Sequence, residues 1–212
     1  MQRQRSIRRN NGFSLVELLV GMAISSLVLT AIYGLLITNS KSYSSLENTM
    51  GMTQDLRAAT AMMIREIRMA GCDPTGAGGI GFLDDSDDDN DTDANSIRFT
   101  MDTDADGATT GTNEDINYYL YTADGIQKLG RNTGGSGGTP QPVAEYITAL
   151  TFTYYDDAAN TLSPGTSATD REKIYRVQVS ISAETPRTDA ITGAKKTQTV
   201  TTSVWVRNTG LE

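Results

Sequence analysis

The pattern of apolar and polar residues divides the chain into three parts. Residues 18–40 form a run of 23 residues without a charge, "LLVGMAISSLVLTAIYGLLITNS". A helix of that length extends about 34 Å, enough to cross the roughly 30 Å hydrocarbon core of a bilayer. Residues 41–70 contain no proline, and apolar side chains recur there at spacings of three and four, which predicts an amphipathic helix. The apolar stripe consists of Met52, Leu56, Ala59, Met63, Ile67 and Ala70.

The third part alternates apolar and polar residues with a period of two. Gly71, followed by Pro74, predicts the end of the helix before it. The alternation predicts strands at 96–102, 115–122, 126–131, 145–156, 173–184 and 197–208. Ala-Asp-Gly at 123–125 predicts a tight hairpin turn, and 132–142 and 163–170 are expected to be loops. With no helical pattern between the strands, we expect an α+β fold: one long helix packed on an antiparallel sheet.

Composition and charge exclude several classes of function. The net charge is −8, and residues 84–106 contain ten aspartates and one arginine, whereas residues 1–12 carry four arginines and no acid. A broad basic face for nucleic acid is therefore not expected. The chain has no histidine and one cysteine, Cys72, which excludes Ser-His-Asp and Cys-His catalytic sites, the usual zinc sites and an intrachain disulfide. We expect a protein that is not an enzyme.

The amino-terminal segment allows three interpretations. The arginines before the apolar run hold the amino end in the cytoplasm, so the rest of the chain lies across the membrane. A secretory signal peptide would be cut at a small-residue site after the apolar run, but "ITNSKSYSS" after Leu36 has no clear A-x-A pattern. A plain signal anchor does not explain Glu17. A cut after Gly12 would make Phe13 the new amino terminus and Glu17 the fifth residue of the mature chain.

The stretch "GFSLVELLV" resembles the class III signal of type IV pilins and type II secretion pseudopilins. The shared features are a short basic leader, Gly12 before the cut, Phe13 after it, Glu17 four residues on, and a long apolar helix. The resemblance implies that a prepilin peptidase removes residues 1–12 and N-methylates Phe13.

An acid at the start of a membrane segment needs a partner. Cleavage would create an amino group near the depth of Glu17. When such helices pack into a filament, Glu17 of one subunit meets the amine of Phe13 on its neighbour. Our hypothesis is that this pair sets the axial register of assembly.

Further motifs, "MIREIRMAGCDP", "SIRFTMDTDADG", "VAEYITALTFTYYD" and "VWVRN", are similar to PilW-type minor pilins and, more loosely, to J-type pseudopilins of type II secretion. The resemblance implies four regions. These are a removed leader (1–12), a membrane and assembly helix (13–40), an amphipathic helix (41–71) and a β-rich periplasmic or extracellular domain (72–212).

The expected function is a low-abundance type IV pilus subunit that helps to initiate assembly and sits at the pilus tip. The implied location is the inner membrane, with one span and the carboxy-terminal domain in the periplasm, and then the pilus. The implied partners are prepilin peptidase, the inner-membrane assembly platform, and other minor and major pilins. Two alternatives stay open: a type II secretion pseudopilin, and a calcium-dependent adhesin or other ligand-binding module on a pilin scaffold.

Two acidic loops raise the question of calcium, although no cofactor is required. "DTDADG" places Asp102, Asp104 and Asp106 at the first, third and fifth positions of a calcium loop, with Gly107 at the sixth. The backbone carbonyl of Ala108 and the side chain of Glu114 are further candidate ligands. A second, weaker candidate consists of Asp85, Asp87, Asp89, Asp91 and Asp93. The alternative is that both are solvated acidic turns. For Cys72, a small buried apolar residue is the preferred interpretation, and an intermolecular disulfide is the alternative.

Overall fold

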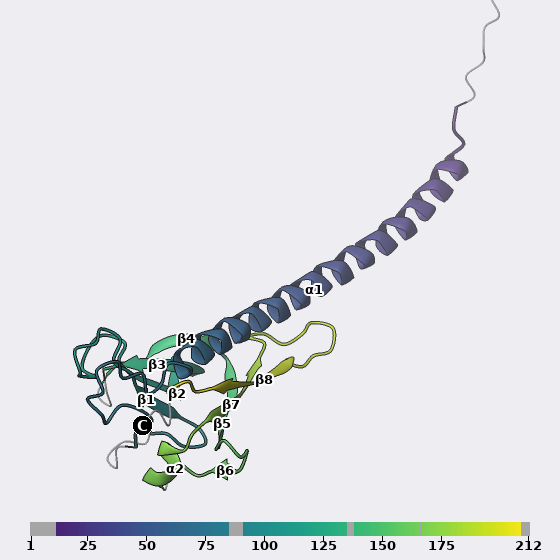
Figure 1. Ribbon diagram of the computed structural model, residues 1–212. Helices are drawn as coiled ribbons and strands as arrows, with labels where there is room; N and C mark the ends of the chain where they lie inside the picture. The colour runs from purple at the N-terminus through teal and green to yellow at the C-terminus, as the bar shows by residue number, and fades with distance from the viewer. Residues whose placement is uncertain (1–11, 85–90, 135–137, 166, 209–212) are drawn as a thin grey trace, which may run out of the picture. The chain divides into compact units, whose positions relative to one another are not determined.

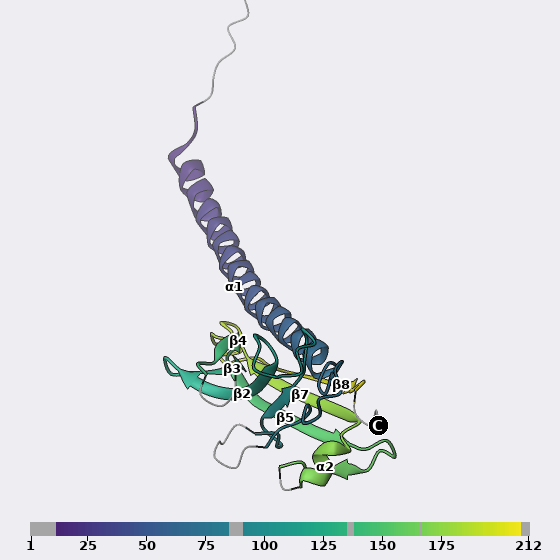
Figure 2. The same ribbon diagram turned by 60° about the vertical axis from the view of Figure 1, so that its left-hand side comes forward.

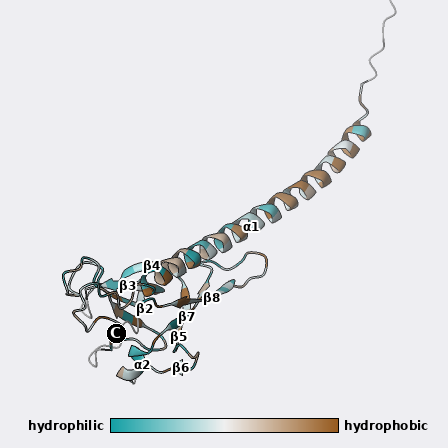
Figure 3. Ribbon diagram, viewed as in Figure 1, coloured by the Kyte–Doolittle hydropathy of each residue, from teal (hydrophilic) through white to brown (hydrophobic). Residues whose placement is uncertain are grey.

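A computed structural model describes residues 12–84, 91–134, 138–165 and 167–208. The chain divides into two compact units, residues 1–45 and 46–212. A single helix, α1 (Leu15–Ile67, 53 residues), passes from the first unit into the second. In Figure 3 the amino-terminal part of α1 is mostly hydrophobic, and polar residues become frequent along its carboxy-terminal part. This confirms the predicted change of character within one helix.

The carboxy-terminal end of α1 closes at the predicted glycine. The last turn tightens, with Met69 N–H donating to Glu66 O at 2.8 Å and Ala70 N–H to Ile67 O at 3.1 Å. Gly71 then takes a left-handed conformation, φ +75°, which costs little only for glycine. Its N–H donates to Thr100 O at 3.0 Å, so the helix end is joined to the first strand.

The second unit contains two antiparallel sheets rather than the single sheet that the sequence predicts. The first, in spatial order, consists of β1 (Ile97–Thr100), β2 (Asp115–Ala123), β3 (Ile126–Thr133) and β4 (Gln141–Glu145). The second, also in spatial order, consists of β6 (Thr161–Leu162), β5 (Ile147–Tyr155), β7 (Arg176–Glu184) and β8 (Thr197–Trp205). Figures 1 and 2 show both sheets against the carboxy-terminal part of α1. The α+β class with an antiparallel arrangement is therefore confirmed.

Two predicted segments differ from the structure. The expected strand 145–156 is divided at Tyr146, where φ is +58°. Glu145 ends β4 in the first sheet and Ile147 begins β5 in the second, so one residue changes the chain from sheet to sheet. The second difference is a short helix, α2 (Ala168–Glu172), within the predicted loop 163–170; Ser167 caps it by accepting the Asp170 N–H.

The predicted hairpin turn is present. Ala123 pairs with Ile126, and the two turn residues, Asp124 and Gly125, have φ values of +55° and +73°. Two consecutive positive φ values match the two-residue turn for which Asp-Gly is favoured.

The core lies between the carboxy-terminal part of α1 and the two sheets. The predicted helical stripe supplies it: Leu56, Met63 and Ile67 are fully buried, and the other members of the stripe are buried as well. Inward-facing strand residues complete the same cluster, among them Phe99, Tyr118 and Val179. The amphipathic pattern of residues 52–70 is thus confirmed as a packing pattern.

An ion pair of low exposure joins α1 to the first sheet. Glu66 accepts two hydrogen bonds from the Arg131 guanidinium, each at 3.0 Å, and a third from the Tyr118 hydroxyl. The Arg131 and Glu66 side chains are 9% and 14% exposed. Burial, and next the charge of Glu66, raise the pKa of Tyr118 well above its ordinary value, so this hydroxyl stays a donor.

Candidate assembly site and acidic loops

The amino end of α1 is defined by Ser14. Its carbonyl accepts the Leu18 N–H at 3.1 Å, and its Oγ accepts the Val16 N–H at 3.3 Å. Serine is a favoured residue at this position because it satisfies backbone donors that a helix start leaves free. Glu17 lies in the first turn, where the helix dipole favours a negative charge.

Glu17 and Phe13 lie on one face. Together with Leu18, Gly21, Met22 and Ser25 they line a shallow hollow of ≈ 480 Å³. Phe13 is 84% exposed, and Glu17 is exposed too. A Cβ placed on Gly21 would have no atom within 4 Å, so this position is open for another helix to approach.

The apolar part of α1 has no polar side to present to water. α1 includes a segment apolar and long enough to cross a membrane, and none of that segment is buried within the structure. Exposed leucine, isoleucine and valine occur around its whole circumference, for example Leu27, Val28 and Leu29 at 73%, 48% and 63% exposure. A helix that is apolar on all sides requires an apolar environment on all sides.

The described residues begin at Gly12, the residue before the predicted cut. Gly12 and Phe13 are exposed and precede the helix. Residues 1–11, which belong to the predicted leader, lie outside the described part of the chain.

Three aspartates of the first acidic loop come together. One carboxylate oxygen from each of Asp102, Asp104 and Asp106 lies within 4.8 Å of the others. Asp102 is fully buried, and its carboxylate accepts the N–H groups of Ala105 at 2.7 Å and Gly107 at 3.1 Å. Desolvation, followed by the negative charge of Asp106, raises the pKa of Asp104. A cation placed among these oxygens would remove that repulsion.

The other two predicted calcium ligands are the side chain of Glu114 and the backbone carbonyl of Ala108. Glu114 is outside the group of three aspartates. Its Oε1 accepts the Thr103 N–H at 2.9 Å and its Oε2 accepts the Gly111 N–H at 2.8 Å, so it holds the loop closed. The Thr103 N–H is the main reason that the pKa of Glu114 is lowered. Ala108 donates its N–H to Asp106 Oδ1 at 2.8 Å.

The second acidic loop is described only in part. Asp85, Asp87 and Asp89 lie outside the described residues. Asp93 closes a turn, because its Oδ1 accepts the N–H groups of Asn95 at 2.6 Å and Ser96 at 2.8 Å. Asp91 accepts a hydrogen bond from the Ser96 hydroxyl through its backbone carbonyl.

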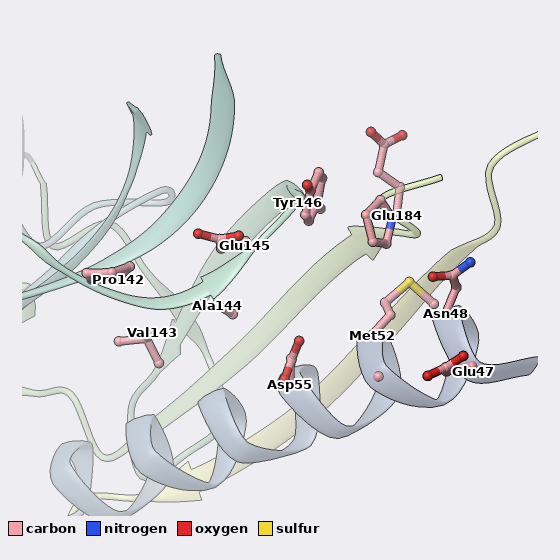
Figure 4. A pocket seen from close by; sticks show the side chains of 12 residues that line it. Glu47, Asn48, Met52, Asp55, Pro142, Val143, Ala144, Glu145, Tyr146 and Glu184 are labelled. Carbon is pink, nitrogen blue, oxygen red and sulfur yellow. The ribbon is translucent and has the colours of Figure 1, made fainter. Parts of the chain in front are cut away.

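A groove that the sequence pattern does not reveal lies beside α1. It has a volume of ≈ 420 Å³ and brings together residues from α1, from the β4–β5 junction and from the end of β7. Figure 4 shows Asp55 pointing from the helix toward the strands, with Tyr146 above it. Glu145 pairs with Lys128 at 2.7 Å and Glu184 pairs with Lys195. Two of the four carboxylates that line the groove are therefore paired, and Glu47 and Asp55 supply its negative charge.

Cys72 follows the helix end and is half-buried against the core. Its carbonyl accepts the Asp102 N–H at 2.8 Å, which connects the end of α1 to the first acidic loop.

The amino-terminal geometry is accompanied by a match to a known motif. Residues 7–33 match the family described as the prokaryotic N-terminal methylation motif. No curated protein matches the chain. Among solved structures, the chain is similar to the type IV-like pilin TTHA1219 from Thermus thermophilus, with 14% identity, a TM-score of 0.45, and coverage of 74% of this chain and 97% of that one. The amino-terminal segment of this chain therefore carries a prokaryotic N-terminal methylation motif.

Proposed function

We propose that this protein is a type IV pilin-like subunit, processed at Gly12–Phe13 and anchored by the first part of α1. It acts as a low-abundance pilus subunit that helps to start assembly and occupies the tip. The observation that carries the proposal is the methylation motif at residues 7–33, which continues into α1. That helix has Glu17 in its first turn and an apolar segment long enough to cross a membrane. The soluble unit then presents its surface to other subunits.

The role proposed for Glu17 follows from electrostatics. Cleavage before Phe13 leaves a positive amine near an exposed carboxylate in an apolar environment. A carboxylate there is costly unless it is paired. A neighbouring subunit in correct register supplies the opposite charge, and a shifted neighbour leaves both charges without a partner. Gly21, on the same face, lets the neighbouring helix come close.

Mass spectrometry of membranes and sheared filaments tests the proposal. The expected chain begins at N-methylated Phe13 and enters filaments in amounts far below the major subunit. Glu17→Ala should be processed but excluded from the filament, whereas Glu47→Ala, which removes an exposed acid from the same helix, should assemble normally. Incorporation of Glu17→Ala at the wild-type level would refute the assembly role.

A type II secretion pseudopilin is the nearest alternative, because the same processing and the same helix serve both machines. Deletion of this chain distinguishes the two. Loss of pili with normal secretion of folded exoproteins supports the pilus, and loss of secretion with intact pili supports the pseudopilus.

We also propose Ca²⁺ as a ligand of the first acidic loop, because the oxygens of Asp102, Asp104 and Asp106 lie within 4.8 Å of one another. Thermal unfolding with Ca²⁺ and with chelator tests this. Ca²⁺ should raise Tm, and Asp104→Asn should abolish the rise while increasing Tm in chelator by removing one repelling charge. Asp157→Asn, an exposed acid in another turn, is the control. Equal Tm values with Ca²⁺ and with chelator would leave the loop as a turn held by its own hydrogen bonds.

A further inference from the structure

The outer strands of the two sheets differ in how their free edges are protected. The edge of β1 is covered, because Thr100 N–H donates to Gly81 O at 2.8 Å and Leu83 N–H donates to Arg98 O at 3.0 Å. β4 contains Pro142 and has a register shift against β3, and β6 has only two residues. Covering, proline, irregular register and shortness are known ways of blocking an edge.

β8 has none of these protections. Its nine residues, "TQTVTTSVW", contain no charge and no proline, and each pairs with β7 in an unbroken register. Long, regular and uncharged edges are templates for the addition of another strand.

The outward backbone groups of β8 follow from the pairing pattern. Val206 N–H donates to Tyr175 O at 2.9 Å, and Lys196 O accepts the Thr185 N–H at 2.8 Å. Because bonded pairs alternate along an antiparallel ladder, even-numbered residues of β8 bond to β7 and odd-numbered residues face outward. The outward residues are Thr197, Thr199, Thr201, Ser203 and Trp205. Within the described part of the chain, no backbone hydrogen bond reaches them from another segment.

One end of this edge combines an aromatic ring with arginines. Trp205 is 58% exposed and pairs across the strands with Arg176. The Arg176 guanidinium lies 3.9 Å from the centre of the Tyr155 ring. Arg207 follows β8, and its N–H donates to Arg68 O at 3.4 Å. Because Tyr155 belongs to β5, the Arg176 guanidinium points away from the free edge of β8. Among the described residues, Arg68 and Arg207 form no ion pair.

We propose that the free edge of β8 binds an extended segment of a partner protein as an added antiparallel strand. A carboxylate of that segment lies near Arg68 and Arg207, beside Trp205. Charge complementarity identifies this partner, because the chain has a net charge of −8 but this end of the edge is cationic. Backbone hydrogen bonds supply affinity, and the exposed tryptophan is a typical anchor of an interface.

A second copy of the chain fits this edge less well. Antiparallel pairing of two β8 strands would place Arg207 of each copy near the end that follows Lys195 and Lys196 of the other. Those lysines already pair with Glu184 and Asp189, and β8 itself contains no acid, so a second copy offers Arg207 no carboxylate within the joined strands. That the partner is another filament subunit rests on the proposed function, whereas the binding of an added strand does not.

The test uses Trp205 as the reporter, since it is the only tryptophan in the chain. The full chain in detergent micelles is titrated with a synthetic peptide of alternating threonine and valine that has two aspartates at its amino end. Binding should shift the Trp205 emission to shorter wavelength. The same peptide with two lysines in place of the aspartates should bind about tenfold more weakly, because like charges then meet the arginines.

A matched pair of variants tests the backbone contact. Thr201→Pro removes an N–H that faces the free edge and takes no part in the pairing with β7, so the fold should be retained. Thr201→Val loses the same hydroxyl, which lies 3.0 Å from Ser180 Oγ, but keeps the N–H. Circular dichroism should be alike for the two, and only Thr201→Pro should lose the shift in emission.

Three results would overturn the inference: an emission unchanged by either peptide, equal affinities of Thr201→Pro and Thr201→Val, or a shift that needs only a higher protein concentration and so reports pairing between copies. The proposed function is tested separately. If the wild-type chain stays out of filaments, that function fails while the titration still decides the edge. If Glu17-dependent assembly occurs without peptide binding, only the edge inference fails.

Discussion

At the scale of single residues, the ion pair Glu66–Arg131 is the polar contact whose removal should lower the unfolding free energy most. Both side chains are largely buried, and Glu66 accepts three hydrogen bonds. Glu66→Ala leaves the Arg131 charge without its partner, so we expect a loss of about 3–5 kcal/mol in unfolding free energy. Denaturant unfolding of the full chain in detergent micelles measures it.

The control for this prediction is Lys128–Glu145, where Glu145 is 46% exposed. Glu145→Ala should cost about 1 kcal/mol or less. Equal losses at the two sites would mean that burial does not govern the contribution of these ion pairs.

A second residue-scale prediction concerns acid. The pKa of Asp73 is lowered from 3.8, chiefly by the Gly78 N–H at 2.8 Å. A lowered pKa means that its stabilisation is complete above the unfolded value of 3.8 and disappears as the pH falls through the lower folded value. Thermal melts between about pH 6 and pH 2 should show a smaller acid-induced loss for Asp73→Asn than for wild type.

At the scale of elements, two glycines of the helical region should respond in opposite directions to alanine. Gly51 lies within α1, and an added Cβ meets no atom within 4 Å. Gly51→Ala should stabilise the protein by about 0.5–1 kcal/mol. Gly71→Ala places a Cβ at φ +75°, where it should cost about 1–2 kcal/mol. Thermal melts of the two variants measure these effects. Shifts of Tm in the same direction for both variants would contradict this account.

The elements differ in how far the sequence could predict them. The stripe from Met52 to Ala70 and the Asp-Gly turn follow from local rules of spacing and turn chemistry, and both are present as predicted. The division of strand 145–156 was not predicted, because the segment contains no glycine, proline or asparagine to mark a break at Tyr146. Only the pairing of Lys128 with Glu145 and of Ala183 with Ile147 shows that the two halves belong to different sheets.

The candidate sites also differ in how far the sequence could predict them. The Gly12–Phe13–Glu17 pattern is local, and Phe13 and Glu17 line the same hollow. The pairing of Glu17 with the Phe13 amine of a neighbouring subunit stays a prediction. The loop aspartates are also local, and they do come together. The position of Glu114 depends on where β2 begins, and its carboxylate bonds to Thr103 and Gly111 rather than joining the aspartates. The edge of β8 required knowledge of strand order, which no spacing reveals.

At the scale of the whole molecule, the division into two units predicts that residues 46–212 fold without residues 1–45. All apolar core residues, from Met52 to Val206, belong to the unit 46–212. A fragment of residues 46–212 should melt within about 4 °C of the full chain, because that shift corresponds to 1–2 kcal/mol. A fragment that begins at residue 57 lacks Met52 and Leu56 and should melt at a clearly lower temperature. Failure of the 46–212 fragment to fold would mean that the core depends on residues 1–45.

The apolar surface of the first unit also bears on the free energy of the proposed assembly. Lipid tails are as apolar as leucine, so moving this helix from a bilayer into a bundle of helices exchanges one apolar surrounding for another. In the proposed assembly, this exchange releases little hydrophobic free energy in either direction. The free energy that drives the helix into the bundle must then come from polar groups and from the assembly machinery that extracts it from the membrane. A subunit assembled in this way would keep its solubility in lipid while it is part of the proposed filament.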